Sequence, residues 1–393
     1  MALRVVLIGA TGSVGTSVLD ICRRFPERFE LVALAARTNA DALLELAREF
    51  GVRCACLHAP SRETCRRFAD AGVDLESGSS GLCALASRCD ADHVVFASSG
   101  TDAIPALQRA LAADKDVSLA NKESVVAAGP WVMPLVRRKD QLRPVDSEHS
   151  AIWQCLRDEP ERCVAKIYLT ASGGPFRDWP IERMRGIRPE DALRHPVWSM
   201  GAKITVDSAT LMNKGIECIE AMQLFHLRAD QVGALVHPRS QVHGLVAFTD
   251  ATMKLLFSRP DMRLPAAAAL AWPDRLPLAA EPSLAIPPVA EWALQFTEPD
   301  TDRFPCLNLA LEAGRRGGAY PPLLIGADAF AVNAFLEERI SFLEIYCIIE
   351  NVLERYAGGA PVTLEDAVDL ISQGERMAKE ICSEQNGGWK INR

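Results

Sequence analysis

The sequence predicts an α/β protein with an N-terminal doubly wound domain, a central α+β domain and a C-terminal helical domain. Three observations predict this order. Short apolar runs alternate with helical patterns up to about residue 146, β-rich runs surround one long helical pattern over residues 147–272, and only helical patterns follow residue 305. Regular alternation of strands and helices is typical of a mainly parallel sheet.

The first domain is expected over residues 1–146. The expected strands are residues 3–9, 29–36, 93–99 and 116–121, and the expected helices are residues 13–25, 40–50 and 103–113. Because helical patterns separate strand-like runs along this part of the chain, the strands should form a doubly wound sheet.

The rest of the chain is expected to contain three further parts. The central domain, 147–272, should have strands at 163–172, 244–250 and 253–258 and one helix at 208–225. Seven prolines over 273–305 predict a linker that runs over the surface. The C-terminal domain, 306–393, should have helices at 306–316, 328–340, 342–356 and 363–382. Thr363 and Asp366 are spaced as a capping pair at the start of the last helix.

Composition excludes several classes of protein. A net charge of −8, without a basic stripe, argues against a nucleic-acid partner. The twelve cysteines include no C-x-x-C, which argues against a zinc ribbon and favours reduced thiols in the cytoplasm. The N-terminus shows no signal peptide, and no apolar run reaches about 18 residues, so we expect no membrane span.

Gly9, Gly12 and Gly15 form a glycine loop between the first strand and the first helix. Glycines let the backbone approach a pyrophosphate, and the helix N-terminus offers free N–H groups, to which Thr11 and Ser13 could add hydroxyl donors. This pattern predicts a Rossmann-like nucleotide-binding domain. The alternative is a tight turn that binds no ligand.

The end of the second strand indicates which nucleotide would bind. Arg37, Thr38 and Asn39 follow this strand, where NAD-binding domains usually have an acid for the ribose 2′-hydroxyl. A cation with two polar groups suits a 2′-phosphate better. The sequence therefore favours NADP(H) as the cofactor.

Two acids and a histidine lie close together in the sequence at 146–149. On an extended segment Asp146 and Glu148 would share one face. On the expected helix Glu217 would share a face with Asn213 and Lys214. Carboxylates alone favour Mg²⁺ or Mn²⁺ over zinc. Exposed acids and a salt bridge on the helix surface remain the alternative.

The order of motifs is similar to that of one known family. The motifs are GATGSVG at 9–15, ANKES at 120–124, VDSEHSAI at 145–152, ASGGPFR at 171–177, HPVWSMGAKITVDSATLMNKGIE at 195–217, HPRSQVH at 237–243 and PDMRLP at 260–265. On these motifs the chain resembles the 1-deoxy-D-xylulose 5-phosphate reductoisomerase family. The resemblance implies the NADPH- and metal-dependent rearrangement and reduction of this sugar phosphate to 2-C-methyl-D-erythritol 4-phosphate in isoprenoid synthesis. It also implies a homodimer.

The resemblance also implies roles for individual residues, and the residue types themselves add Arg37, Thr38, His149 and Trp198 to the sets below. The metal ligands would be Asp146, Glu148 and Glu217. Contacts to the cofactor would come from Thr11, Gly12, Ser13, Val14, Arg37, Thr38, Asn39, Asn121, Glu123 and Gly201. Contacts to the substrate would come from Lys122, Ser147, Glu148, Ser172, His195, Trp198, Ser208, Asn213, Lys214 and Glu217. The catalytic residues would be Lys122, Glu148, His149 and His195.

Some of these features also fit a purely structural role, and some depart from the family. Residues 173–201 have glycines at both ends and suit a lid over the substrate, although Trp198 could simply be buried. Lys122 could form a salt bridge with Glu123, and His149 could be structural.

The chain departs from the family at Arg37 and Thr38, where glycine and a basic residue are usual, and in the segment 325–335, which lacks the usual Asn-Glu pair.

Two other functions are compatible with the glycine loop. The aspartate-semialdehyde dehydrogenase family begins with a similar loop, but no cysteine here lies in the motif of its nucleophile. A catalytically idle NADP-binding regulator is the second alternative. The acids and Lys122 would have no purpose in either protein.

Overall fold

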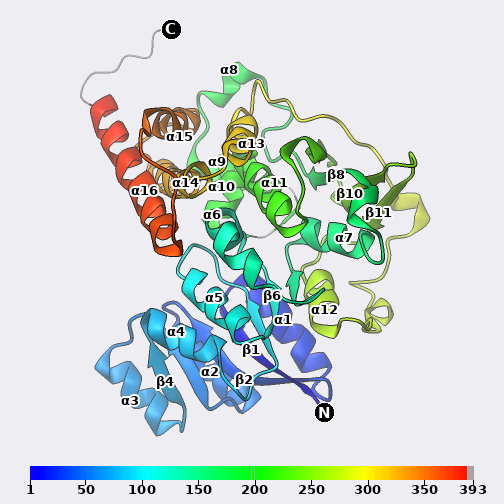
Figure 1. Cartoon of the computed structure of the whole chain (residues 1–393), viewed down its shortest axis with the longest axis vertical. Helices are drawn as coiled ribbons and strands as arrows, with labels where there is room; N and C mark the ends of the chain where they lie inside the picture. The colour runs from blue at the N-terminus through cyan, green and yellow to red at the C-terminus, as the bar shows by residue number, and fades with distance from the viewer. Residues whose placement is uncertain (196, 199, 387–393) are drawn as a thin grey trace. The chain divides into compact units, whose positions relative to one another are not determined.

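The computed structural model of the chain describes residues 1–195, 197–198 and 200–386 (Figure 1). Residues 196 and 199 of the predicted lid, and 387–393 of the predicted C-terminal domain, lie outside the described residues. The chain divides into two compact units. Unit 1 contains Met1–Ser124, Pro130–Trp153 and Asp261–Ile286, and unit 2 contains the other described residues. The domain boundaries expected from the sequence remain a prediction.

Unit 1 is built on a parallel sheet. Its described strands have the order β4-β3-β2-β1-β5-β6-β7, and each pairs in parallel with its neighbours. The strands are β1 Leu3–Ile8, β2 Phe29–Ala36, β3 Cys54–Leu57, β4 Asp74–Ser77, β5 His93–Phe96, β6 Asp116–Leu119 and β7 Leu142–Pro144. The helices are α1 Ser13–Arg24, α2 Ala40–Phe50, α3 Arg62–Asp70, α4 Gly78–Ala86, α5 Ile104–Ala112, α6 Lys122–Val132, α7 Ser147–Cys155 and α12 Arg263–Ala271, of which α6 and α7 continue into unit 2.

Strand β1 shows why both faces of this sheet are covered. Val5 and Leu7 belong to a core cluster with α1, α2 and α12, whereas Val6 and Ile8 are buried outside that cluster. Since successive side chains of a strand point to opposite faces, β1 is buried on both sides, as is typical of a doubly wound sheet. Figure 1 shows α1 beside α12, although α12 is distant in sequence.

Unit 2 combines a mixed sheet with helices. The sheet has the order β11-β10-β8-β9, with β8 Val164–Ala171, β9 Val232–Val236, β10 Val242–Phe248 and β11 Met253–Phe257. Strand β8 pairs with β9 in parallel and with β10 in antiparallel orientation. The helices are α8 Ile181–Met184, α9 Pro189–Ala192, α10 Ala202–Thr210, α11 Met212–Leu224, α13 Cys306–Arg316, α14 Tyr320–Leu336, α15 Glu344–Arg355 and α16 Leu364–Asn386.

The predicted α/β class is confirmed, with corrections in the helices. The helix expected at 208–225 is two helices, because Leu211 adopts a left-handed backbone (φ 62°) between α10 and α11. The capping pair is present, since Asp366 N–H donates to the Thr363 hydroxyl at 3.1 Å and Thr363 N–H donates to the Asp366 carboxylate at 2.9 Å. Within the described part of the chain, no helix is both long and apolar enough to cross a membrane.

Candidate active site

The carboxyl ends of the parallel strands place several predicted site residues at one edge of unit 1. The glycine loop follows β1, Arg37 follows β2, and Lys122 and Asp146 follow β6 and β7. The strand order reverses between β1 and β5, which is the usual position of a ligand in such sheets.

The glycine loop is shaped by two close approaches. Gly9 has φ +88°, and a Cβ atom there would lie 2.6 Å from the backbone of Ala97 and Ser98. A Cβ atom on Gly15 would lie 2.2 Å from the Gly9 carbonyl oxygen, whereas one on Gly12 would make only an ordinary contact at 3.4 Å. Gly12 and Ser13 are exposed at the start of α1, and no side chain caps this N-terminus. The geometry therefore suits an anionic group.

The polar side chains at the end of β2 differ in exposure and in the contacts they already make, and therefore in how readily they can bind a cofactor. The Arg37 side chain is 71% exposed, and its guanidinium lies 3.5 Å from the Asp102 carboxylate. Thr38 is also exposed. The Asn39 side chain caps α2 by accepting a hydrogen bond from Ala42 N–H at 3.1 Å. Arg37 therefore supplies the cation of this segment that can meet a 2′-phosphate.

Asn121 has a structural task in unit 1. Its amide group donates to the carbonyl oxygens of Ser98, at 2.9 Å, and Gly100, at 2.7 Å, and its oxygen accepts from Ser124 N–H at 3.0 Å. The side chain thereby fixes the loop after β5 that also contacts the glycine loop. Neighbouring Glu123 is half-buried in the first turn of α6.

Lys122 and Asp146 form a nearly buried ion pair, in which the Lys122 Nζ lies 2.7 Å from the Asp146 carboxylate. The predicted salt bridge between Lys122 and Glu123 is therefore not needed to explain Lys122. Burial tends to raise the pKa of Asp146, but the Lys122 charge and His149 outweigh it and hold this pKa well below its usual value. Asp146 is thus a carboxylate at neutral pH, as a metal ligand must be.

The extended segment expected at Asp146 and Glu148 is wrong. Helix α7 begins at Ser147, and the Asp146 carboxylate accepts from Glu148 N–H at 3.3 Å. Aspartate is among the preferred residues at this capping position, because it accepts from unpaired N–H groups of the first turn. Both acids consequently lie at the positive end of the α7 dipole. Ser147 donates to the Glu148 carboxylate at 2.7 Å, and His149 Nδ1 lies 3.4 Å from Asp146.

His195 joins two serines in unit 2. Its Nε2 lies 3.2 Å from the Ser172 hydroxyl and 3.1 Å from the Ser208 hydroxyl. Its Nδ1 accepts from the N–H groups of Val197 and Trp198, so the ring proton of the neutral form resides on Nε2. Burial lowers the pKa of His195 to about 4, and the ring is therefore neutral at pH 7.

A second polar group in unit 2 lies on α11. Asn213 and Lys214 both donate to the Glu217 carboxylate, and Lys214 and Glu217 are buried. Glu217 is therefore a buried carboxylate with a cation beside it, and the surface salt bridge considered as an alternative is wrong. Gly201, a predicted cofactor contact, is exposed at the start of α10.

Sequence reasoning missed two buried residues in unit 2. Glu220 is fully buried on α11, three residues after Glu217, and that helical spacing could have indicated it. The ring of His243 lies 6.3 Å from that of half-exposed Trp198, and the motif HPRSQVH contains this histidine.

The donor sets fit the cofactors expected from the sequence. Asp146, Glu148 and Glu217 offer only carboxylate oxygens, which Mg²⁺ prefers. The exposed N-terminus of α1 and the cation at Arg37 fit a dinucleotide with a 2′-phosphate.

Comparison with known families gives three matches along the chain. Residues 5–129 match the family described as 1-deoxy-D-xylulose 5-phosphate reductoisomerase, residues 142–225 match the C-terminal domain of the same enzyme, and residues 257–377 match the DXP reductoisomerase C-terminal domain.

Relatives and solved structures agree over nearly the whole length. The 1-deoxy-D-xylulose 5-phosphate reductoisomerase of Thermomicrobium roseum is 45% identical over 98% of this chain and 98% of its own, and that of Gloeobacter violaceus is 43% identical over 96% and 95%. The Zymomonas mobilis enzyme in complex with NADPH has a TM-score of 0.88 and 35% identity over 97% of this chain and 99% of its own. A DOX-P reductoisomerase in complex with NADPH, fosmidomycin and magnesium has a TM-score of 0.90 and 34% identity over 98% and 100%.

Proposed function

Because the chain belongs to the 1-deoxy-D-xylulose 5-phosphate reductoisomerase family, we propose that it converts 1-deoxy-D-xylulose 5-phosphate to 2-C-methyl-D-erythritol 4-phosphate. The chain is then an oxidoreductase that uses NADPH and Mg²⁺ to rearrange and reduce a sugar phosphate. The observation that carries this function is the presence, at one sheet edge, of a dinucleotide loop and an ionised acid beside Lys122.

NADPH binds at the carboxyl edge of unit 1 in this proposal. The N–H groups at Thr11, Gly12, Ser13 and Val14 face the pyrophosphate, and Arg37 meets the 2′-phosphate. Release of Arg37 from Asp102 is easy, because both side chains are exposed. Thr38, Asn39, Asn121, Glu123 and Gly201 complete the proposed cofactor contacts, with Asn39 and Asn121 acting partly by fixing α2 and the loop after β5.

The proposed metal ligands are Asp146 and Glu148 of unit 1 and Glu217 of unit 2, with Mg²⁺ or Mn²⁺ as the ion. When bound, the cation stabilises negative charge on substrate oxygens and NADPH supplies hydride. Lys122 polarises a substrate oxygen and assists proton movement, while its ion pair with Asp146 keeps that ligand deprotonated. His149, beside Asp146, orients this carboxylate.

The proposed phosphate site is in unit 2. His195 donates from Nε2, Ser172 and Ser208 donate from their hydroxyls, and Asn213 and Lys214 supply an amide and a cation. Ser147 and Trp198 are the remaining proposed substrate contacts. A neutral His195 keeps its Nε2 proton available over the whole physiological pH range.

The predicted lid, 173–201, is anchored through part of its length. The ring of buried Phe176 lies 5.2 Å from that of Phe342, and Met184 and Ala192 are buried as well. We therefore propose that closure over the substrate involves the part that carries His195 and Trp198, and excludes water there.

The edge of the unit 2 sheet supports a homodimer. Strand β11 is an edge strand, and its Met253 and Leu255 are 52% and 39% exposed. Val289, Trp292 and Leu294 of the same unit add exposed apolar surface, and the Trp292 ring contacts that of Phe257 on β11. An apolar edge strand is a ready partner for another strand, and a second copy would cover it symmetrically.

The dimer has a direct test. Leu255→Lys should shift the protein to monomer in size-exclusion chromatography with light scattering. Val362→Lys is the control, because Val362 is 82% exposed and distant in sequence from β11. A dimer that withstands Leu255→Lys would show that another surface pairs.

All twelve cysteines are free thiols, which supports the cytoplasm as the location.

The decisive experiment follows NADPH oxidation with 1-deoxy-D-xylulose 5-phosphate, with and without Mg²⁺. Glu217→Gln should weaken metal binding and lower turnover, with NADPH affinity unchanged. Asp328→Asn is the matched control, since Asp328 is another buried acid of unit 2 paired with a lysine, Lys203. Full activity after chelation, or parallel loss of NADPH binding in Glu217→Gln, would contradict the proposed site.

A further inference from the structure

Asp146 and Glu148 lie where strand β7 changes into helix α7. Strand β7 ends at Pro144 and α7 begins at Ser147. The positions of both carboxylates therefore depend on how firmly these two elements are held to each other. The ion pair of Lys122 with Asp146 holds the first of these acids.

Arg143 holds the β7 side of this junction. Its guanidinium is nearly buried and has three acceptors on three different segments. Nε donates to the Asp140 carbonyl oxygen at 2.7 Å, Nη1 donates to the Ala269 carbonyl oxygen of α12 at 3.0 Å, and Nη2 pairs with the Asp116 carboxylate of β6. Because the guanidinium is a rigid planar fork, these bonds fix β7 against β6, α12 and the turn at Asp140.

Trp153 holds the α7 side of the same junction. Its indole N–H donates to the Asp140 carboxylate at 2.8 Å, and its ring lies 4.7 Å from that of Trp272, which follows α12. Asp140 thus accepts from Arg143 through its carbonyl and from Trp153 through its carboxylate. We call Arg143, Asp140 and Trp153 the Arg143 bracket.

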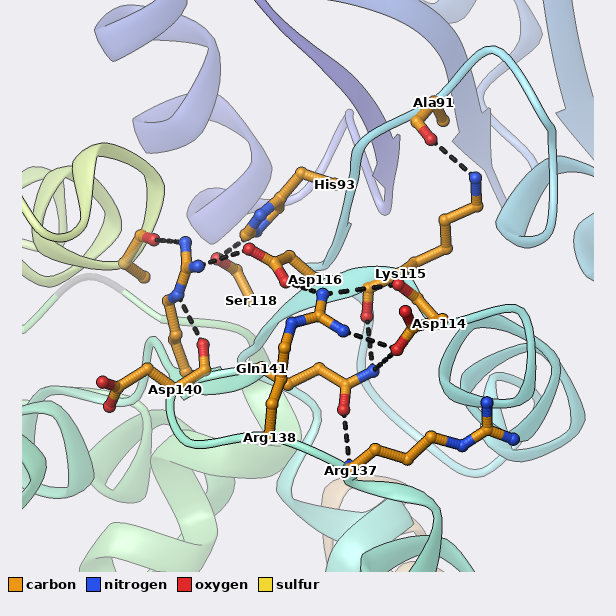
Figure 2. A network of polar contacts seen from close by, with 12 residues as sticks. Ala91, His93, Asp114, Lys115, Asp116, Ser118, Arg137, Arg138, Asp140 and Gln141 are labelled. Atoms are coloured by element: carbon orange, nitrogen blue, oxygen red, sulfur yellow. Dashed lines mark hydrogen bonds and ion pairs between the residues drawn. The ribbon is translucent and has the colours of Figure 1, made fainter.

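The neighbouring polar network provides a matched arginine outside the bracket. Arg138 and Gln141 lie on the turn that precedes β7. Figure 2 shows that Arg138 donates to the carboxylates of Asp114 and Asp116, and that Gln141 donates to that of Asp114. Arg138 pairs with the same Asp116 carboxylate as Arg143, but its side chain is 44% exposed. The Arg138 guanidinium donates to Asp114, just before β6, and to Asp116, the first residue of β6. The Arg143 guanidinium donates in addition to the carbonyl oxygens of Asp140 in the turn and of Ala269 in α12.

We infer that the Arg143 bracket positions Asp146 and Glu148 for the divalent cation, by tying the strand before them and the helix after them to one turn and to α12. This inference rests on the proposed metal site. The three residues of the bracket are positioning residues, because none of them belongs to the proposed metal ligands or substrate contacts. They act like the outer partners that orient metal ligands, whose loss usually weakens metal affinity about 10- to 100-fold.

The test measures Mn²⁺ affinity of the full-length protein by the electron paramagnetic resonance signal of free Mn²⁺. Arg143→Met should weaken Mn²⁺ binding about tenfold. Arg138→Met removes an arginine from the same carboxylate and should change the affinity by less than about twofold. NADPH affinity, followed by its fluorescence, should stay unchanged in both variants, and the KM for metal should rise more than kcat falls.

Two further variants keep the test decisive if Arg143→Met does not fold. Trp153→Phe retains the ring contact with Trp272 but loses the hydrogen bond to Asp140, and should weaken Mn²⁺ binding in the same direction. Asp140→Asn keeps an oxygen acceptor for the indole N–H and should bind nearly as the natural protein does. Equal Mn²⁺ affinity in Trp153→Phe, Arg138→Met and the natural protein would overturn the inference.

Asp146→Asn separates the inference from the function on which it rests. If Asp146→Asn binds Mn²⁺ as tightly as the natural protein, the metal site itself is wrong and the bracket loses its purpose. If Asp146→Asn loses Mn²⁺ but Arg143→Met and Trp153→Phe do not, the metal site stands and only the positioning role is refuted.

Discussion

Alanine replacements at the three loop glycines should separate folding from cofactor binding. At Gly9 the backbone has φ +88°, and a Cβ atom would lie 2.6 Å from the backbone between Ala97 and Ser98. A left-handed conformation costs a non-glycine residue roughly 1–2 kcal/mol, and overpacking adds about 1–3 kcal/mol. We therefore expect Gly9→Ala to lower the free energy of unfolding by about 3 kcal/mol.

Gly15 and Gly12 should respond differently. Gly15→Ala would bring a Cβ atom to 2.2 Å from the Gly9 carbonyl oxygen, so its destabilisation should be at least as large as that of Gly9→Ala. A Cβ atom on Gly12 meets nothing closer than 3.4 Å, and its φ of −86° is acceptable to alanine. Gly12→Ala should leave stability nearly unchanged but obstruct the pyrophosphate, weakening NADPH binding about tenfold, or roughly 1.4 kcal/mol.

The assay combines thermal unfolding with NADPH titration by fluorescence. A loss of about 3 kcal/mol should lower Tm by about 6–12 °C in a unit of this size. A Gly9→Ala protein with the natural Tm would refute the close approach of the glycine loop to the loop after β5. Undiminished NADPH affinity in Gly12→Ala would refute the assignment of the α1 N-terminus to the pyrophosphate.

Three further predictions concern specificity, pH and the lid. Arg37→Ala should raise the KM for NADPH more than that for NADH, and an equal rise would show that Arg37 does not contact the 2′-phosphate. Burial lowers the pKa of His93 to about 3, whereas an unfolded histidine titrates near about 6.5. Between these two values the unfolded state binds a proton on His93 that the folded state does not. The free energy of unfolding should therefore fall by about 2 kcal/mol as the pH is lowered from about 6.5 to about 5. When the free energy of unfolding in urea is measured as a function of pH, His93→Gln should lack this loss of stability at low pH. A loss as large as that of the natural protein would contradict this prediction. Tryptophan fluorescence should change when Mn²⁺ and a phosphonate hydroxamate bind and the lid closes. A change of the same size in Trp198→Phe would show that Trp198 takes no part in lid closure.

Local patterns in the sequence were sufficient to predict much of unit 1. The strand at Phe29–Ala36 and the helix at Ala40–Phe50 have the predicted limits, because continuous apolar runs and amphipathic spacing are local signals. The short strands β3 and β4 and helices α3 and α4 were not predicted. Strand β4 lies at the sheet edge with mostly exposed side chains, and therefore lacks the apolar run on which prediction depends.

The residue types of the candidate site were also available from the sequence, but their contacts were not. The acids at Asp146 and Glu148 predict a cation site from their chemistry, yet the local backbone was predicted wrongly, because capping by Asp146 starts a helix there. The neutral state of His195 and the ionised state of Asp146 depend on burial and on partners distant in sequence, so no local pattern contains them.

By itself, the sequence determined the α/β class, the glycine loop at the end of β1 and the kinds of side chain that serve a dinucleotide and a divalent cation. These features depend on residues close together along the chain. Only the tertiary structure decided that Arg143 binds the Ala269 carbonyl oxygen, 126 residues away, and that Trp153 packs on Trp272. Such contacts form because folding packs α12 against α1, β6 and β7 within unit 1, and their energies depend on burial that no short segment of sequence specifies.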